Sequence, residues 1–226
     1  MQASTNPKDQ REELVQAINE LYQVQLITST GGNLSVRIPG REEAWITPSR
    51  LYKGNLVPDV MVRIDLEGNP LDKNSLSPSS ERLVHTEIYK ARPDVQAVIH
   101  THAPQSTILG LSRRPFLPVT VDAALIKELP LVPFYMPGSA ELAQAVAFAL
   151  STNTACIMQN HGLVVVANNL RRAINLTEAV ERNCQLILGS FDAGTVPQTL
   201  PDHVVRMIHE VEDVVKMMQE SGELLD

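Results

Sequence analysis

The stretch VQAVIHTH, residues 95–102, joins an apolar run to two histidines at its end. A short apolar run of this kind predicts a buried β-strand. Alternate residues of a strand point to the same face of a sheet, so His100 and His102 are expected to project toward one point. The sequence therefore predicts a sheet in which one strand delivers two imidazoles to a single site.

A third histidine follows another apolar run, in the stretch ACIMQNHG at residues 155–162. Three histidines at strand ends suit a catalytic zinc ion, which takes three protein ligands and leaves a position open for substrate. Any one of these histidines, taken alone, is more typical of a packed residue that binds no metal. The pair at 100 and 102, taken together with His161 and the upstream Glu81, favours a metal site.

Length and composition limit the classes of protein to which this chain can belong. A chain of 226 residues can bury a sizeable core, and we expect one α/β domain over residues 1–226. With 19 basic against 26 acidic residues, the net charge of −7 argues against a nucleic-acid partner. Cys156 and Cys184 lack CxxC spacing and predict buried thiols in a reducing compartment. Neither a signal peptide nor a membrane-spanning run is evident, so we expect a cytoplasmic protein without a membrane partner.

Periodicity and turn residues predict an alternating series of elements. Helices are expected over residues 9–26, 81–89, 104–111, 140–150 and 170–188, and further strands over 34–38, 44–47, 61–65, 131–135 and 163–167. This mixed order favours a sheet covered by helices. A final amphipathic helix, at about residues 201–220, is expected to pack on the core or to reach a subunit interface.

Glu81 stands in the stretch SPSSE, residues 77–81, at the predicted start of a helix. Free backbone amides at a helix start favour an anion, so the carboxylate should remain ionised. This position is compatible with a plain helix N-terminal charge and, beside a metal, with a ligand or general base. His85 would lie on the same helix face, and we expect it to pack or to support a ligand, because three strand histidines already fill the site.

Two polar segments have the composition of anion-binding loops. TGGN, residues 30–33, has glycines whose backbone can approach a ligand closely, although such a tetrapeptide is also typical of a plain turn. ITPSR, residues 46–50, places two hydroxyls beside Arg50, with Lys53 nearby, which suits anion recognition better than a tight turn.

Five segments occur in the order typical of the class II aldolase/adducin family: TGGNLS (30–35), ITPS (46–49), PSSE (78–81), HTH (100–102) and QNHG (159–162). The chain resembles this family, which includes zinc-dependent sugar-phosphate lyases, over about residues 11–188. The resemblance implies a three-layer α/β/α sandwich with a mostly antiparallel central sheet. It also implies a homotetramer with its active sites at subunit interfaces.

The resemblance also implies a role for each site residue. Zinc would be held by His100, His102 and His161, with manganese or cobalt as alternatives, because such ligands accept several metals. Glu81 would coordinate the metal at rest and then take a proton from the substrate. The residues implied around the substrate phosphate are Asn33, Thr47, Ser49, Ser79 and Ser80.

Two departures from the family pattern bear on the substrate. Arg50 stands where the aldolases have glycine, and its guanidinium would either bind a phosphate or carboxylate or block the phosphate seat. The family's tyrosine proton donor, which a neighbouring subunit supplies, aligns with Val121 here. Asp122 and Tyr135 are the candidate replacements, although Asp122 is also compatible with an ordinary surface carboxylate.

These features predict a zinc-dependent lyase that cleaves a carbon–carbon bond in a small phosphorylated or carboxylated hydroxy-carbonyl substrate. The reaction would pass through an enediolate stabilised by the metal. Aldol cleavage is the leading hypothesis, and decarboxylation of a sugar acid phosphate or dehydration on the same site are the alternatives. A non-catalytic, adducin-like assembly module is the alternative outside enzymes, but it would have no physical need for three convergent imidazoles and a carboxylate.

Overall fold

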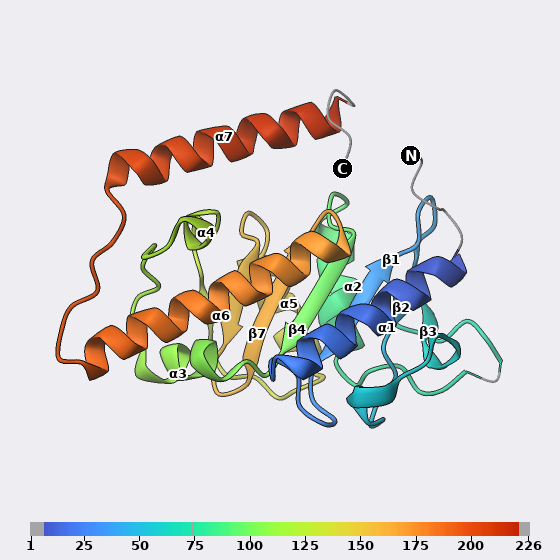
Figure 1. The fold of residues 1–226 in the computed structure, drawn as a ribbon. Helices are drawn as coiled ribbons and strands as arrows, with labels where there is room; N and C mark the ends of the chain where they lie inside the picture. Colours follow the sequence, from blue (N-terminus) through green and yellow to red (C-terminus); the bar gives the residue numbers. More distant parts are fainter. Residues whose placement is uncertain (1–6, 74, 222–226) are drawn as a thin grey trace.

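A seven-stranded sheet forms the centre of the computed structural model, which describes residues 7–73 and 75–221 (Figure 1). Its order is β3-β2-β1-β4-β7-β6-β5, and only β5 and β6 run parallel to each other. The strands are β1 (Asn33–Arg37), β2 (Glu43–Ile46), β3 (Val62–Asp65), β4 (Ala97–Thr101), β5 (Leu131–Val132), β6 (Ala155–Met158) and β7 (Gly162–Ala167). The expected mostly antiparallel sheet is confirmed.

Helices connect these strands. They are α1 (Pro7–Gln23), α2 (Arg82–Ala91), α3 (Pro104–Ser112), α4 (Val121–Ala124), α5 (Ala140–Ala149), α6 (Leu170–Asp192) and α7 (Asp202–Glu220), with the short 3₁₀ helices η1 (Lys53–Asn55) and η2 (Pro58–Val60). Among the described residues, none of these helices combines the length and the apolar character needed to cross a bilayer.

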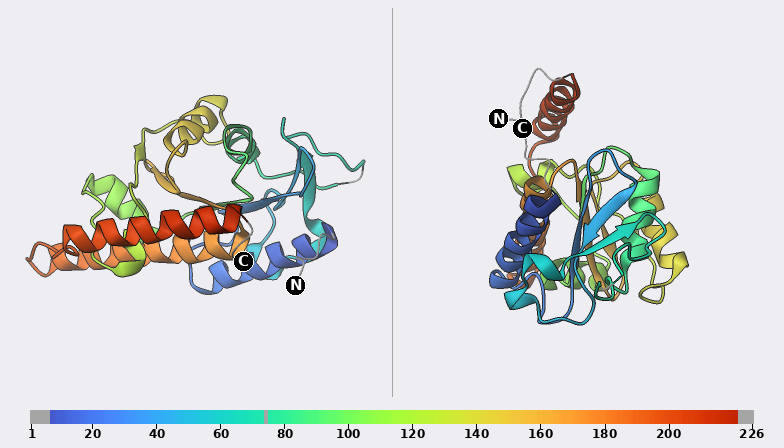
Figure 2. Two further views of the ribbon diagram at one scale, coloured as in Figure 1. Left: turned by 90° about the horizontal axis from the view of Figure 1, so that it is seen from above. Right: turned by 90° about the vertical axis from the view of Figure 1, so that its right-hand side faces the viewer.

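The sheet is covered on both faces, as the two views in Figure 2 show. Helices α1, α3 and α6 pack on one face and α2 and α5 on the other, and each face has its own apolar core. In β4, Ala97 and Ile99 belong to the first core and Val98 to the second, because successive side chains of a strand alternate between faces. This arrangement confirms the expected α/β/α sandwich.

Helix α7 stands apart from the sandwich, beyond α6 (Figure 1). It is attached through the Lys127–Asp213 ion pair at 2.9 Å and through His209, whose Nε2 donates to the carbonyl of Ala124 at 2.7 Å. Three apolar side chains of its amphipathic pattern are about half exposed, namely Met207, Val211 and Val214. Its predicted place at a subunit interface therefore stays a prediction.

Two elements differ from those the sequence predicts. The strand expected over residues 131–135 contains only Leu131 and Val132, because Pro133 has no amide hydrogen to continue the ladder. The strand that leads to His161 ends earlier, at Met158, so the histidine lies in the tight turn between β6 and β7. Both differences arise at the end of a strand, where apolar pattern is least informative.

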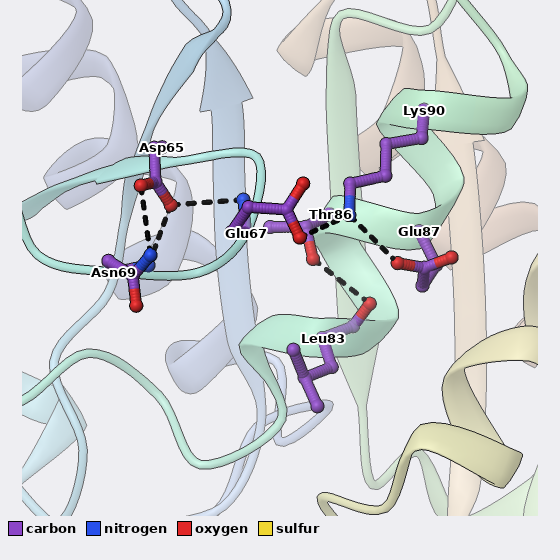
Figure 3. A network of polar contacts seen from close by, with 7 residues as sticks. All are labelled: Asp65, Glu67, Asn69, Leu83, Thr86, Glu87 and Lys90. Carbon is purple, nitrogen blue, oxygen red and sulfur yellow. Dashed lines mark hydrogen bonds and ion pairs between the residues drawn. The ribbon is translucent and has the colours of Figure 1, made fainter.

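Figure 3 shows how the outer side of α2 is fastened to the turn that follows β3. The Asp65 carboxylate accepts hydrogen bonds from the backbone amides of Glu67 and Asn69 at 3.0 and 2.8 Å, which closes the turn. Lys90 then pairs with Glu67 at 2.9 Å and with Glu87 of its own helix at 3.1 Å. This exposed clamp helps to hold the helix whose first turn carries Glu81.

Candidate metal and anion site

Four side chains with metal-ligating atoms converge where β4, α2 and the β6–β7 turn meet. One ligand atom from each of Glu81, His100, His102 and His161 lies within 4.8 Å of the others, and we call this group the His/Glu cluster. His100 is the penultimate residue of β4, His102 comes directly after the strand, and Glu81 is the N-cap residue of α2. The structure thus brings together the four residues that the sequence singled out.

The ring orientation of His100 is fixed from outside the cluster. Its Nδ1 lies 3.0 Å from the carbonyl oxygen of Leu163, which can only accept, so Nδ1 carries a hydrogen. The other ring nitrogen, Nε2, lies 3.1 Å from Oε2 of Glu81 but makes no hydrogen bond there. A histidine that donates one nitrogen to a carbonyl and turns the other into a polar cluster has the arrangement of a metal ligand.

Glu81 occupies the middle of the cluster and is only 7% exposed. Its Oε1 lies 3.0 Å from Nε2 of His161, again without a hydrogen bond. Burial raises the pKa of the Glu81 carboxyl, but the interactions with His100 and His161 outweigh burial, so the net pKa falls well below its usual range. The carboxylate is therefore ionised at neutral pH.

The donor set fits a divalent metal ion. Glu81 Oε1 and His100 Nε2 are buried polar atoms without a hydrogen-bond partner among the described residues, and His161 Nδ1 is a third. Burial, followed by the neighbouring imidazole charges, lowers the pKa of His102 to about 4, which keeps that ring neutral and able to coordinate. Three imidazoles and one carboxylate are a ligand combination typical of zinc.

Two glycines permit the close packing of the cluster. A Cβ at Gly31 would lie 2.5 Å from Nδ1 of His102, and a Cβ at Gly162 would lie 2.1 Å from the carbonyl oxygen of Thr101. Any larger residue would force the histidine loops apart. The TGGN segment, uncertain from sequence between a turn and a ligand loop, thus packs directly against a cluster histidine.

The two serine-containing loops that were predicted to bind an anion are joined to each other. The amide of Ser49 donates to the carbonyl of Ser77 at 2.9 Å, and the amide of Ser79 donates to the carbonyl of Thr47 at 3.1 Å. Thr47 is fully buried, and its hydroxyl accepts from the Leu34 amide at 3.2 Å. This pairing places the hydroxyl-bearing segments 47–49 and 77–80 side by side, directly before Glu81.

Positive charge lies along the same loops. Lys53 is 2% exposed, and its Nζ donates to the carbonyl of Pro48 at 2.8 Å. Burial lowers the pKa of Lys53 to about 8. Arg50 is exposed and has a φ of +59°, a left-handed conformation that glycine adopts at less cost. Ser80, one residue before Glu81, is also exposed.

Asn33 is buried, like Thr47 and Ser79, and its side chain contacts the His/Glu cluster. It is 5% exposed, and its Nδ2 donates to Oε2 of Glu81 at 3.0 Å. Its Oδ1 lies 2.5 Å from Nε2 of His85. Both ends of the Asn33 amide therefore contact protein groups, one of them in the His/Glu cluster.

The two candidate proton donors lie on the surface of the chain. Asp122 is exposed at the start of α4 and lines a cavity of about 420 Å³ beside α6. Tyr135 is 38% exposed in the segment after β5. Among the described residues, neither side chain forms a hydrogen bond or an ion pair with the His/Glu cluster, so the assignment of a proton donor stays a prediction.

Of three residues beneath the cluster, two escaped the sequence analysis, and the third, His85, was expected to pack or to support a ligand. They form a buried chain of hydrogen bonds that leads to Asn33 and comprise Ser35, His85 and Tyr89. One signal was present: Glu81, His85 and Tyr89 recur every four residues, which places polar groups on a helix face that should be apolar.

Comparison with known proteins supports the interpretation of the His/Glu cluster as a metal site of an aldolase-type enzyme. The family described as Class II Aldolase and Adducin N-terminal domain matches residues 12–188. The 5-methylthioribulose-1-phosphate/5-deoxyribulose-1-phosphate aldolase of Escherichia coli O45:K1 is 32% identical over 179 residues, which are 78% of this chain and 82% of that protein. The 3-oxo-tetronate 4-phosphate decarboxylase of Escherichia coli K12 is 34% identical over 185 residues, or 78% and 85% of the two chains.

Solved structures agree with the sequence relatives. An L-fuculose 1-phosphate aldolase superimposes with a TM-score of 0.84 at 30% identity, covering 94% of this chain and 98% of that one. The match spans the strands and loops that build the His/Glu cluster. The chain therefore belongs to the class II aldolase and adducin N-terminal domain family, and it is a metal-dependent, aldolase-type carbon–carbon lyase.

Proposed function

We propose that this protein is a zinc-dependent aldolase that cleaves a small phosphorylated hydroxy-carbonyl compound. The proposal is carried by one observation: an ionised, buried Glu81 lies within 3.1 Å of two imidazole nitrogens without hydrogen-bonding to either. A carboxylate in this position can accept a proton from a substrate carbon that a neighbouring metal has made acidic. We further propose that the whole chain is one domain and works in the cytoplasm.

His100, His102 and His161 are the proposed metal ligands, with Glu81 as a fourth ligand before substrate binds. The bound metal supplies a Lewis acid that polarises the substrate carbonyl. In the direction of aldol synthesis, Glu81 removes the proton from the carbon beside that carbonyl, and in cleavage it returns the proton. Manganese and cobalt are the alternative metals, because imidazole and carboxylate ligands accept both.

The joined loops before Glu81 are the proposed phosphate seat. Ser49 and Ser79 contribute hydroxyls, exposed Ser80 lies at the mouth, and Thr47 stiffens the loop from below. Asn33 contributes through its contact with Glu81. The seat lies at the first turn of α2, where backbone amides favour an anion.

The proton that leaves the substrate hydroxyl during cleavage needs a second acceptor. Asp122 and Tyr135 are the candidates, and either would act from a neighbouring subunit of a homotetramer. The exposed apolar side chains near Tyr135 and along α7 support such an assembly. A tetramer with active sites between subunits is thus part of the proposal.

Decarboxylation of a sugar acid phosphate is the second candidate, and Arg50 is the observation that favours it. The backbone of Arg50 has a φ of +59°, which is strained for a residue other than glycine and is not needed in a plain turn. Its exposed guanidinium suits a carboxylate ligand. A decarboxylase is among the relatives at 34% identity. Loss of carbon dioxide would leave the same type of enediolate, so Glu81 would keep its role as the proton carrier.

The deciding experiment follows deuterium exchange into dihydroxyacetone phosphate by NMR, with zinc-loaded protein and with a strong chelator. Exchange that stops with the chelator and in Glu81→Gln supports aldol chemistry. Metal-loaded wild-type protein without exchange, but with release of carbon dioxide from a 3-oxo-sugar acid phosphate, would establish the decarboxylase. The partly exposed Glu87 lies on the same helix, and Glu87→Gln is the matched control, which should retain full activity.

A further inference from the structure

A polar stripe on α2 faces a polar stripe on β1 beneath the His/Glu cluster. Glu81, His85 and Tyr89 recur every fourth residue, and Asn33 and Ser35 every second. Four helical residues rise by about 6 Å and two strand residues by about 6.8 Å, so the two stripes stay in register as they run side by side. All five side chains are buried, with at most 7% exposed.

Four hydrogen bonds connect the two stripes in a single line. Tyr89 and Ser35 lie 2.8 Å apart through their hydroxyl oxygens, and Ser35 Oγ lies 2.7 Å from Nδ1 of His85. His85 Nε2 lies 2.5 Å from Oδ1 of Asn33, and Asn33 Nδ2 lies 3.0 Å from Oε2 of Glu81. The line therefore begins at a buried phenol and ends on the proposed base.

The chemistry of the groups allows only one direction for these bonds. An ionised carboxylate only accepts, so the Asn33 atom next to it must be the NH₂ group, and Oδ1 must face His85. His85 must then donate from Nε2. Burial lowers the pKa of His85 to about 3, so the ring is neutral and its Nδ1 is an acceptor for the Ser35 hydroxyl. Ser35 in turn accepts from Tyr89. Every donor hydrogen points toward Glu81.

We propose that His85 is a positioning residue for Glu81, a role that rests on the proposed function of that carboxylate as the base. The Nε2–H tautomer of His85, held by Ser35, prevents the Asn33 amide from flipping. A flipped amide would turn its oxygen toward the carboxylate and leave a buried NH₂ without a partner. The Asn33 bond holds Oε2 in place, so Oε1 is the oxygen that exchanges protons.

The first test reads the tautomer without any reaction. Protein with ¹⁵N-labelled histidine is observed by long-range ¹H–¹⁵N NMR, and the signals lost in His85→Gln identify His85. A neutral ring protonated on Nε2, the same from pH 6 to 8, is expected. A ring protonated on Nδ1 would overturn the proposal, because Nε2 could then not donate to Asn33.

The second test compares variants in the deuterium-exchange assay. His85→Phe keeps a flat ring but removes both bonds, and we expect kcat to fall about 10- to 100-fold with little change in KM, as when a residue supporting a ligand is lost. His85→Gln keeps an amide donor for Asn33 and should recover most of that loss. Equal rates in the two variants would overturn the proposal.

Tyr89→Phe is the matched control, since it removes one equally buried bond at the far end of the line. Ser35 can still donate to His85, so we expect less than about a threefold change in kcat. If kcat fell in Tyr89→Phe as far as in His85→Phe, and in both variants in proportion to the loss of thermal stability, the line would have a structural role only. Wild-type protein without any exchange would instead contradict the proposed function, and the tautomer measurement would still decide the orientation of Asn33.

Discussion

Two buried glutamates, Glu81 and Glu181, show how similar side chains acquire different roles. They are 7% and 9% exposed, and each lies where a helix meets its neighbours. Glu181 of α6 accepts from the backbone amides of Gln105 and Ser106 at 2.7 and 2.8 Å, one with each oxygen. Within the described part of the chain, Glu81 accepts one side-chain hydrogen bond, from Asn33, and its other oxygen has no partner.

The difference lies in what satisfies the negative charge. Both oxygens of Glu181 are engaged by the first turn of α3, where free amides and the helix dipole stabilise an anion. Each oxygen of this carboxylate thus has its own backbone donor. The other oxygen of Glu81, Oε1, lies 3.0 Å from Nε2 of His161 without a hydrogen bond, which suits a metal and a substrate proton. Burial of a carboxylate alone therefore says little about its function. The groups around each of its oxygens determine whether it is structural or reactive.

Removing the charge of Glu81 should give the largest effect. We expect Glu81→Gln to lower turnover by about 10³-fold, because the amide cannot accept the substrate proton. Stability should stay within about 1 kcal/mol, since the amide can still contact Asn33 and the imidazoles. Exchange kinetics and thermal melts check both expectations. Turnover near the wild-type rate would remove Glu81 from the mechanism.

Metal binding should stabilise the region around Glu81. At a zinc concentration about a hundredfold above its Kd, we expect the free energy of unfolding of wild-type protein to rise by about 2.7 kcal/mol. A chelator should abolish the gain, and His161→Ala should not show it. Thermal melts with and without zinc measure this effect, and His203→Ala, an exposed histidine on α7, is the control. An equal gain in both variants would mean that zinc binds elsewhere.

The corresponding change in the structural glutamate should affect stability instead. We expect Glu181→Gln to lower the free energy of unfolding by about 2 kcal/mol, because an amide nitrogen would then face one of the two backbone donors. Turnover should change less than about twofold once folding is accounted for. Denaturant unfolding gives the stability, with the exposed Glu178→Gln as control. A catalytic loss without a stability loss would contradict the distinction between the two glutamates.

A buried cation extends the comparison to pH. Burial lowers the pKa of Lys53 from its ordinary 10.5 to about 8, so between these values the unfolded chain binds more protons than the folded one. The contribution of Lys53 to the free energy of unfolding should therefore rise as the pH increases from 8 to 10.5. Relative to Lys53→Met, we expect wild type to recover about 2 kcal/mol over that window. A constant difference between the two proteins would show that Lys53 stays protonated in the folded protein as it does in the unfolded chain.

Exposed carboxylates should matter least. In the clamp of Figure 3, Lys90 pairs with Glu67 and Glu87 at the surface, where water screens the charges. We expect Lys90→Met to cost about 0.5 kcal/mol, and the cost should shrink in high salt. Urea unfolding at low and high salt measures it. A loss that is larger than about 1 kcal/mol and insensitive to salt would mean that the clamp acts through packing.

Local sequence determined much of the architecture and part of the site. The apolar runs predicted β4, β6 and β7, and the spacing of His100 and His102 predicted one shared point, because strand alternation is a property of the backbone. The ordered motifs added His161 and Glu81, and the comparisons confirm the family to which they pointed. Each of these inferences used either neighbours along the chain or motif order.

Only the tertiary structure decided which polar groups satisfy one another. Asn33 and Glu81 are 48 residues apart, and Gln105 and Glu181 are 76 apart, so no local pattern distinguishes the reactive carboxylate from the structural one. The line from Tyr89 to Glu81 likewise depends on how α2 packs against β1. Periodicity reports which face of an element is buried, whereas a hydrogen-bond partner is set by the packing of two elements, and packing exists only once the chain has folded.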